Sequence, residues 1–480
     1  MAGKSPKLSV IQIESPPATE PSPSRVPVDF FPYSDLGNAE RFVKHYLNTF
    51  RYDHKRRIWL AWQGHWWAQV EESVLFRASV KVTRETKVKA KEKGDELLHK
   101  WMLATESGSH LKEMVSRARS MNPIAVEQGT WDQDAYLFGV ANGVIDLRTG
   151  KFRAGKREDN ITLHSPVAYN PAAKCPAFDK FFSEIFLDRE DLARYVIKAL
   201  GYSMTGDTRE RCLFIKYGSG NNGKSILGSL IGYIMGDYGK STPSETLSST
   251  REEGPRNDIA RLSDARYVTA SESGLKKGVA EELLKRITGK DVFVARYLHR
   301  EFFEFVPRFK FWLSCNHKPP IQGTDAAIWS RIPLIPFEAE FRGEKENKDL
   351  DTQLLAEAPG ILNRLIAGCL LWQKEGLQLP DCIRDASADY RSESNPIAPF
   401  LDTCCECDPT QTAPTPEDEW AIGKTELFAA YVAYCAKMKL KPDVKNVFGA
   451  NVKAAGFQDA RSNTARWWIG IKLSNPVSNW

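Results

Sequence analysis

The stretch that decides the fold is "CLFIKYGSGNNGKSILGSLIGYIM", residues 212–235, in which a polar, glycine-rich loop separates two apolar runs. The first run is short and typical of a buried strand, and the second has the length of a helix. Gly218, Gly223, Lys224 and Ser225 satisfy the spacing G-x-x-x-x-G-K-[ST]. Between a strand and a helix this spacing predicts a phosphate-binding loop, and a chance match by a glycine-rich turn is the alternative.

Each part of the loop has a physical role in this prediction. Glycines let successive backbone N–H groups point at phosphate oxygens, and the following helix adds the positive end of its dipole. Lys224 is expected to reach the β- and γ-phosphates of ATP, and the Ser225 hydroxyl to bind Mg²⁺. The residues expected to contact the nucleotide are Gly218, Ser219, Gly220, Asn221, Asn222, Gly223, Lys224, Ser225 and Ile226.

Length and composition indicate a water-soluble protein with several domains. The 480 residues exceed what one core commonly serves, so we expect about two to four domains. No stretch approaches the roughly 18 uninterrupted apolar residues of a membrane span, and "MAGKSPKLSV" at the start lacks an apolar signal core. We therefore expect a cytoplasmic protein without a membrane partner, in a bacterial host if a phage or plasmid encodes it. The nine cysteines are scattered, which favours reduced thiols over a metal site.

Two strand-like runs beyond the loop end in polar residues suited to hydrolysis. "ARYVTASES" predicts a strand followed by Glu272, an acid that would orient Mg²⁺ or the attacking water. "FKFWLSCN" ends at Asn316, whose amide is suited to the sensor role of ring ATPases. Arg331 begins the apolar run of "RIPLIPF" and is a candidate finger on a neighbour's nucleotide. Each residue alone is more often structural, but their order after the loop forms a coherent set.

The stretch "GKDVFVARYLHREFFEFVPR", residues 289–308, predicts a basic β-hairpin. Two β-prone runs flank "YLHR", so we expect His299 and Arg300 near the tip and Arg296 beside it. A ring motor can use one such loop per subunit to hold the phosphates of a threaded single strand. An ordinary surface hairpin with solubilising charges is the alternative.

The ordered set "GSGNNGKS", "ASES", "GKDVFVARYLHREFFEF", "FKFWLSCNHKPP" and "GTDAAIWSRIPLIPF" resembles the superfamily 3 helicases of the AAA+ class. The resemblance is to phage and plasmid primase C-terminal helicases and their poxvirus primase-helicase relatives. It implies an ATP-driven DNA helicase that forms a homo-hexamer and moves 3′ to 5′ on a single strand.

The resemblance assigns site roles by position. Lys224 and Ser225 hold phosphate and Mg²⁺, Glu272 is the Walker B acid, Asn316 is sensor 1 and Arg331 is the finger. Two departures stand out: Ser330 replaces a basic residue often found before the finger, and no primase domain precedes residue 34. The second departure implies a separate primase or polymerase as a partner.

The pattern and the resemblance together divide the chain into five segments of an α/β protein. Residues 1–33 are a Pro- and Ser-rich disordered tail, and 34–170 an α+β N-terminal domain. Residues 171–376 form the AAA+ P-loop ATPase core with a helical lid, and 377–420 are a linker. Residues 421–480 form a winged-helix domain.

The last segment carries the charge expected of a DNA-binding domain. Nine basic residues against three acidic ones from 421 onward give it a net charge of +6, which exceeds the +5 of the whole chain. Lys445, Asn446 and Lys453 are expected on or near the helix offered to a DNA groove, and Arg461 and Arg466 on the wing. A winged helix that contacts protein is the alternative.

Two other motifs are interpreted as structural. Asp132 and Asp134 in "WDQDA" could suggest a two-metal site for primase chemistry, but their polar, loop-like context lacks a rigid strand and further acids. Trp59, Trp62, Trp66 and Trp67 could stack on bases, although such clusters more often form core.

Three functions therefore compete. The preferred one is an ATP-dependent replicative helicase acting on single-stranded and forked DNA. The second is an origin-binding initiator that uses ATP as an assembly switch. The third is a P-loop kinase of small molecules, which would form no ring and ignore DNA.

Overall fold

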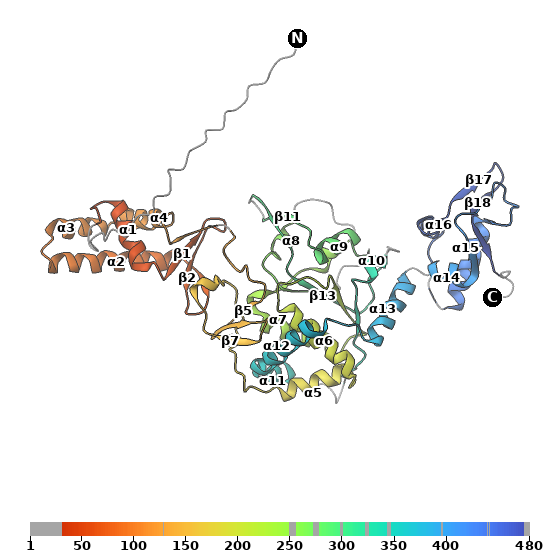
Figure 1. The fold of residues 1–480 in the computed structure, drawn as a ribbon, viewed down its shortest axis with the longest axis horizontal. Coiled ribbons are helices and arrows are strands. Elements are labelled where there is room, and N and C mark those ends of the chain that lie inside the picture. The colour runs from red at the N-terminus through yellow and green to blue at the C-terminus, as the bar shows by residue number, and fades with distance from the viewer. Residues whose placement is uncertain are drawn as a thin grey trace, which may run out of the picture. The chain divides into compact units, whose positions relative to one another are not determined.

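A parallel sheet carries the glycine-rich loop and organises the larger part of the chain (Figure 1). The computed structural model describes residues 31–127, 129–248, 256–271, 278–297, 301–321, 326–342, 347–394, 397–438, 440 and 442–474. The sheet has five strands in the order β14-β8-β13-β10-β9, and every pairing is parallel. Its strands are β8 (Leu213–Tyr217), β9 (Gly239–Ser241), β10 (Tyr267–Ser271), β13 (Lys310–Cys315) and β14 (Leu334–Pro336).

Side chains of alternate residues along each strand enter two different cores, one on each face of this sheet. Phe214, Trp312 and Ile335 lie in one core, whereas their neighbours Leu213 and Leu313 lie in the other. A strand that is buried on both faces has an almost continuous apolar sequence, which explains the pattern of "CLFIKY" and "FKFWLSC". Because the carboxyl ends of parallel strands meet at one edge, polar residues that follow β8 and β13 come together there.

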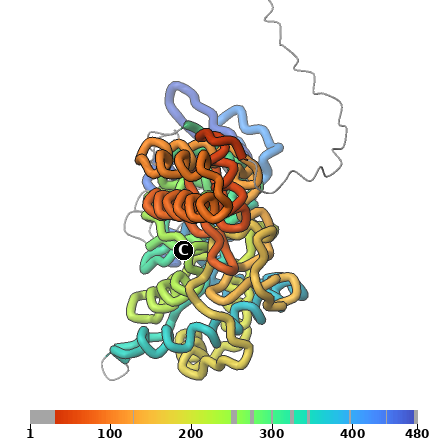
Figure 2. Tube along the Cα trace, turned by 90° about the vertical axis from the view of Figure 1, so that its left-hand side faces the viewer, coloured from red at the N-terminus to blue at the C-terminus, as the bar shows by residue number. Residues whose placement is uncertain are grey.

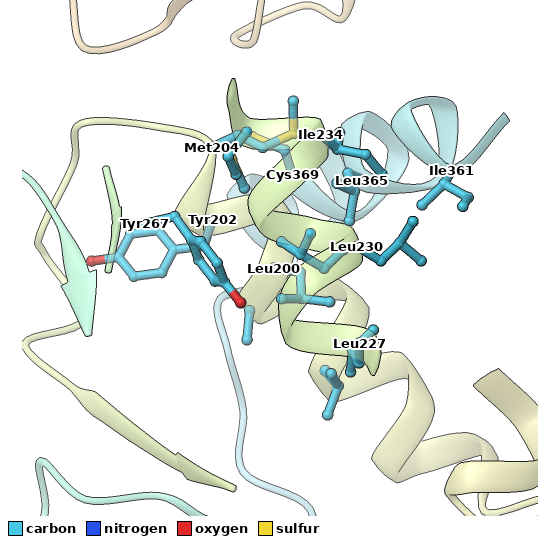
Figure 3. Close-up of a cluster of buried hydrophobic side chains, with 14 of the residues drawn as sticks. Leu200, Tyr202, Met204, Leu227, Leu230, Ile234, Tyr267, Ile361, Leu365 and Cys369 are labelled. Atoms are coloured by element: carbon cyan, nitrogen blue, oxygen red, sulfur yellow. The ribbon is translucent and has the colours of Figure 1, made fainter. Parts of the chain in front are cut away.

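Helices cover both faces of the sheet. The helices that pack into the first core are α5 (Pro176–Ile185), α6 (Glu190–Ser203), α7 (Lys224–Met235), α11 (Leu350–Ala356) and α12 (Ala358–Glu375). Figure 3 shows Leu200 and Leu365 beside Leu230, so α6 and α12 meet α7 in this core. The opposite face is covered by α8 (Asn257–Ala260), α9 (Glu281–Thr288), α10 (Ala326–Trp329) and α13 (Asp381–Ser394).

The predicted hairpin strands are confirmed. β11 (Phe293–Arg296) and β12 (Phe302–Phe305) pair in antiparallel register, with Arg296 opposite Phe302. Phe293 and Ala295 are buried, whereas Val294 and Arg296 are exposed, so the hairpin has one inward and one outward face. His299 and Arg300 lie outside the described residues.

Among the described residues, 31–61 and 69–127 form a separate compact unit. Its elements lie in α1 (Asp35–Tyr46), β1 (Phe50–Asp53), β2 (Ile58–Trp62), β3 (Trp67–Val70), α2 (Glu72–Glu92), α3 (Glu96–Thr105), α4 (Gly108–Ala118) and β4 (Ala125–Val126). Side-chain caps begin two of the helices, since Ser34 accepts from Gly37 N and Asp95 from Leu98 N. Figure 2 shows these helices as parallel coils packed side by side.

The tryptophan cluster is part of the packing, as predicted for core. Trp59 and Trp67 are buried, and Trp62 and Trp66 are half-buried. Trp59 packs against Phe42 and Phe50 within the N-terminal unit.

A three-stranded antiparallel sheet precedes α5 and belongs to the larger unit. Its strands are β5 (Leu137–Val140), β6 (Gly143–Asp146) and β7 (Lys151–Arg153), and the turn at Thr149-Gly150 joins the last two. Buried Arg266 holds this region by donating to Met204 O and Asp134 O. The N-terminal domain predicted for 34–170 is thus divided, because residues 129–170 pack with the larger unit.

The C-terminal segment has its own core of helices and short strands. Its elements are α14 (Ile397–Cys404), β15 (Cys405–Cys407), β16 (Ala421–Gly423), α15 (Lys424–Lys437), α16 (Lys445–Ala454), β17 (Asp459–Arg461), β18 (Arg466–Ile469) and β19 (Ile471–Leu473). Strands β16, β18 and β17 form an antiparallel sheet, and Trp468 of β18 packs in this core.

The segment predicted as a linker, 377–420, differs from that expectation because it contains helices. Tyr390 of α13 packs beneath the parallel sheet, and Phe400 of α14 packs in the C-terminal core together with Ile397 and Leu401. The polar, acidic composition typical of a linker is confined to residues 408–419. No single helix among the described residues is long and apolar enough to cross a bilayer. The bent pair α11–α12 meets the length and apolar composition of a membrane span only when its two helices are counted together.

Candidate nucleotide site and basic surfaces

The glycine-rich loop lies where β8 ends and α7 begins, as the sequence predicts. Gly220, Asn221 and Gly223 have positive φ angles of 104°, 48° and 81°. A Cβ on Gly218 would lie 2.2 Å from Phe337 O, and one on Gly223 would lie 2.6 Å from the Ile185 side chain. Lack of space therefore requires glycine at positions 218 and 223, and the positive φ adds to this requirement at Gly223.

Lys224 is 5% exposed and is held against the loop. Its Nζ donates to Gly218 O at 2.6 Å and to Asn316 Oδ1 at 3.2 Å. Because β13 lies between β8 and β10, Asn316 follows its strand at the edge where the loop lies. The structure thus brings two of the four predicted catalytic residues into direct contact.

The loop is also tied to the segment that follows β14. Asn222 Nδ2 donates to Phe337 O at 3.0 Å, and Phe341 N donates to Asn221 O at 2.8 Å. These bonds fix the loop against a second segment, so its shape is set before any ligand arrives.

A cavity of about 1330 Å³ opens beside this loop, next to Ser225 and Ile226. Apolar walls come from Phe181, Leu187 and Phe341, and acidic side chains from Glu338 and Glu340. Sequence reasoning missed these residues because they lie far from the loop along the chain and belong to no motif. The cavity combines an apolar wall with a glycine-rich loop at a helix N-terminus, a combination that suits a nucleotide.

Lys216 is a further cation at this edge that sequence reasoning missed. It lies on β8, is 2% exposed, and its Nζ donates to Lys224 O at 3.3 Å. The signal in the sequence was a lysine inside the apolar run "CLFIKY". Burial, with the neighbouring Lys224 charge, lowers the pKa of Lys216 to about 8.

Arg331 lies at the opposite edge of the sheet from the loop. Its carbonyl accepts from Leu213 N, the first residue of the strand whose other end carries the loop. Its guanidinium donates to Lys285 O at 3.1 Å and to Thr288 Oγ1 at 2.9 Å, at the end of α9. Arg331 therefore does not lie beside the loop of its own chain. Glu272 lies outside the described residues.

The predicted acid pair Asp132 and Asp134 is engaged in structural contacts. Asp132 accepts from the backbone of Thr162 at 2.8 Å, and Asp134 forms an ion pair with Arg148 at 2.8 Å. Across the part of the chain that the structure describes, no group of three or more His, Cys, Asp or Glu residues is arranged to hold a metal.

A basic groove of about 1230 Å³ lies in the C-terminal segment, between α16 and the β17–β18 hairpin. All five predicted residues line it and are exposed: Lys445, Asn446, Lys453, Arg461 and Arg466. Lys424 also lines the groove and was missed.

One acid lies among the cations of this groove. Asp459 pairs with Lys424 and, at 2.6 Å, with Lys453. Hydrogen bonds from these two lysines lower the pKa of Asp459 to about 2. The groove therefore presents a positive surface in which part of the charge is neutralised internally.

The remaining predicted DNA contact within the described residues, Arg296, is exposed on β11. Its guanidinium lies 5.1 Å from the centre of the Phe302 ring on β12.

Two family models match the chain. Residues 39–187 match "D5 N terminal like", and residues 216–331 match a family of unknown function, DUF5906. The chain is 25% identical to the putative helicase L207/L206 of Acanthamoeba polyphaga mimivirus, over 72% of this chain and 40% of that protein. The putative helicase 022R of Frog virus 3 is 23% identical, over 58% and 37%.

The two matched domains, together with the viral helicase and primase relatives, support a D5-type primase-helicase family for this chain. This confirms the family suggested by the ordered motifs. Another relative is the putative primase C962R of African swine fever virus, 24% identical over 44% of this chain and 23% of that protein. The chain spans 40% or less of the length of these curated relatives.

The chain also resembles a solved structure. The apo structure of the NrS-1 C-terminal region, residues 305–718, covers 91% of this chain and 99% of its own, with a TM-score of 0.51 and 11% identity. This likeness concerns the fold, a mixed α/β architecture built on a parallel sheet.

Proposed function

We propose that this D5-type chain is an ATP-dependent DNA helicase of the superfamily 3, AAA+ type. One observation carries the proposal: Lys224 Nζ lies 3.2 Å from Asn316 Oδ1 at the carboxyl edge of the parallel sheet, beside the glycine-rich loop. The loop provides a cation for phosphate, and the strand between β8 and β10 provides the amide of a γ-phosphate sensor. The helicase names of the mimivirus and Frog virus 3 relatives support the same activity.

ATP and Mg²⁺ are the proposed cofactors. Close packing against Phe337 and Ile185 requires glycine at positions 218 and 223 and so sets the shape of the loop. That shape, together with Lys224, suits a triphosphate bound by backbone N–H groups. Ser225 and Glu272 would hold Mg²⁺, which supplies charge neutralisation on the phosphate oxygens. The protein's own contribution is to orient the phosphate chain with Lys224 and to hold the water or γ-phosphate with Asn316.

A homo-hexameric ring is the proposed assembly. Arg331 lies across the sheet from the loop of its own subunit, so a finger role requires a neighbouring copy. Hydrolysis at each subunit border would then shift the β11–β12 hairpin that holds the threaded strand.

Single-stranded and forked DNA are the proposed partners. The hairpin would contact the single strand through Arg296, His299 and Arg300, and the basic groove would bind duplex through Lys445 and Arg466. The proposed setting is phage or plasmid replication in a bacterial cytoplasm, with a separate primase or polymerase.

The test compares wild type with Lys224→Ala. We expect wild type to hydrolyse ATP faster with single-stranded DNA and to displace a strand from a forked duplex. Loss of a charge-assisted bond to phosphate should weaken nucleotide binding about 10- to 100-fold and abolish unwinding. Wild type that neither hydrolyses ATP nor unwinds DNA, or a variant with full activity, would contradict the proposal.

An origin-binding initiator is the second candidate, and the basic groove favours it, since a winged helix often reads duplex DNA. It predicts sequence-specific duplex binding without strand displacement, so the same forked substrate separates the two functions.

A further inference from the structure

The Lys216 ammonium contacts the backbone of the nucleotide loop. Its Nζ lies under the first turn of α7, 3.3 Å from Lys224 O, while Lys224 Nζ reaches back to Gly218 O. Two lysines, one from the strand and one from the helix, therefore hold the backbone at the two ends of the same loop.

Gly228, one turn along α7, provides the room for this ammonium. A Cβ on Gly228 would lie 3.1 Å from Lys216 Nζ. Glycine inside a helix is unfavourable relative to alanine, so its presence here is explained by the space that the ammonium needs.

No carboxylate neutralises Lys216 within the residues that the structure describes. The titratable groups that face it are Lys224 from α7 and Cys315 from β13, whereas β14 contributes the non-titrating Ile335. A buried ammonium with one carbonyl partner and a cationic neighbour is unfavourable unless an anion joins it. The anion for which this edge is shaped is the phosphate chain at the loop.

We propose that Lys216 is a positioning residue of the nucleotide site, whose buried ammonium holds the Lys224 carbonyl and adds a second positive charge beneath the bound phosphates. This inference rests on the proposed nucleotide site. It extends that proposal by assigning part of the phosphate affinity to the strand rather than to the loop.

Two consequences distinguish this role from simple packing. A methionine at this position fills a similar volume without a buried charge, so Lys216→Met should leave stability unchanged or raise it while nucleotide binding weakens. In addition, bound phosphates favour the charged lysine, so its pKa rises from about 8 on binding. Affinity is then highest below that pKa and falls as the pH rises through it.

The experiment measures binding of a fluorescent ATP analogue with Mg²⁺ to the full chain between about pH 7 and pH 9.5, a range that brackets the pKa of Lys216. We expect Lys216→Met to bind about 10-fold more weakly than wild type at pH 7, which corresponds to one pKa unit of linkage. Wild type should lose several-fold more affinity than the variant as the pH rises. Thermal unfolding of the variant should match or exceed that of wild type.

Lys198→Met is the matched control, because Lys198 is also buried but bonds Gly376 O and pairs with Glu375 on another part of the core. It should retain wild-type nucleotide affinity and pH dependence. If wild type binds, Lys224→Ala does not, and Lys216→Met matches wild type at every pH, this inference is overturned while the nucleotide site stands. If wild type fails to bind the analogue, both are overturned.

Discussion

The loop edge of the parallel sheet and the basic groove of the C-terminal segment both concentrate positive charge, but the cations are buried at the loop edge and exposed in the groove. At the loop, Lys216 and Lys224 are buried and bond neutral oxygens. In the groove, Lys445, Arg461 and Arg466 are exposed, and Asp459 neutralises part of the charge. Buried cations interact strongly and at fixed distances, whereas exposed cations are screened by salt.

This difference matches the separate roles that we propose for the two surfaces, nucleotide binding at the loop edge and DNA binding in the groove. The loop edge suits one small anion in one geometry, as a chemical step requires. The groove suits a long polyanion that can slide and exchange. The following predictions test this contrast, beginning with the largest effect.

Arg331→Ala should have the largest effect, because a finger on a neighbour's nucleotide is worth about 10³ to 10⁵ in rate. We expect ATP turnover to fall by at least about 10³-fold while affinity for the nucleotide stays near that of wild type. Steady-state turnover and equilibrium binding measure the two separately.

Thr288→Val is the control for Arg331. It removes the hydroxyl that accepts from the guanidinium but leaves the guanidinium itself. It should keep most of the turnover. If Arg331→Ala and Thr288→Val lose the same activity, Arg331 acts only by holding α9, and the finger role fails.

The triple variant Lys445→Ala, Arg461→Ala, Arg466→Ala should have the next largest effect. Duplex DNA affinity should fall about 10²-fold, and the slope of affinity against salt should decrease by about one unit for each phosphate that the variant leaves without a basic partner. The measurement is a titration at several salt concentrations. ATP turnover without DNA should not change, because the groove takes no part in the loop chemistry.

A matched triple on the N-terminal unit, Lys100→Ala, Lys112→Ala, Arg117→Ala, removes the same number of exposed charges. It should leave duplex affinity within about twofold, since scattered charges contribute little. Equal reductions of duplex affinity in the two triple variants would mean that net charge, not the groove, governs DNA binding.

Asp459→Asn should have the smallest effect and the opposite sign. Freeing Lys424 and Lys453 should tighten duplex binding about threefold, while stability at pH 7 falls by less than about 1 kcal/mol because the pairs are partly exposed. The pKa of Asp459 is depressed to about 2, so its contribution is present at neutral pH and disappears as the pH falls from about 4 towards 2. Thermal unfolding at neutral pH and near pH 2 checks the sign, and weaker duplex binding by the variant would contradict this account of the groove.

Much of the fold could be predicted because its signals are local. The spacing from Gly218 to Ser225, the apolar runs of β8 and β13, and the β-prone halves of the hairpin depend only on neighbouring residues. The extent of the C-terminal core could not be predicted in the same way, since α14 joins it across a polar segment. Packing between distant residues decides such boundaries.

By itself, the sequence determined the loop, the strand that ends before Asn316 and the set of exposed basic residues, because backbone conformation and apolar period are encoded over a few residues. Only the tertiary structure decided that Asn316 meets Lys224, that Arg331 lies at the far edge and that Lys216 lies beneath α7. The physical reason is strand order: inserting β13 between β8 and β10 brings together side chains that are distant in the chain.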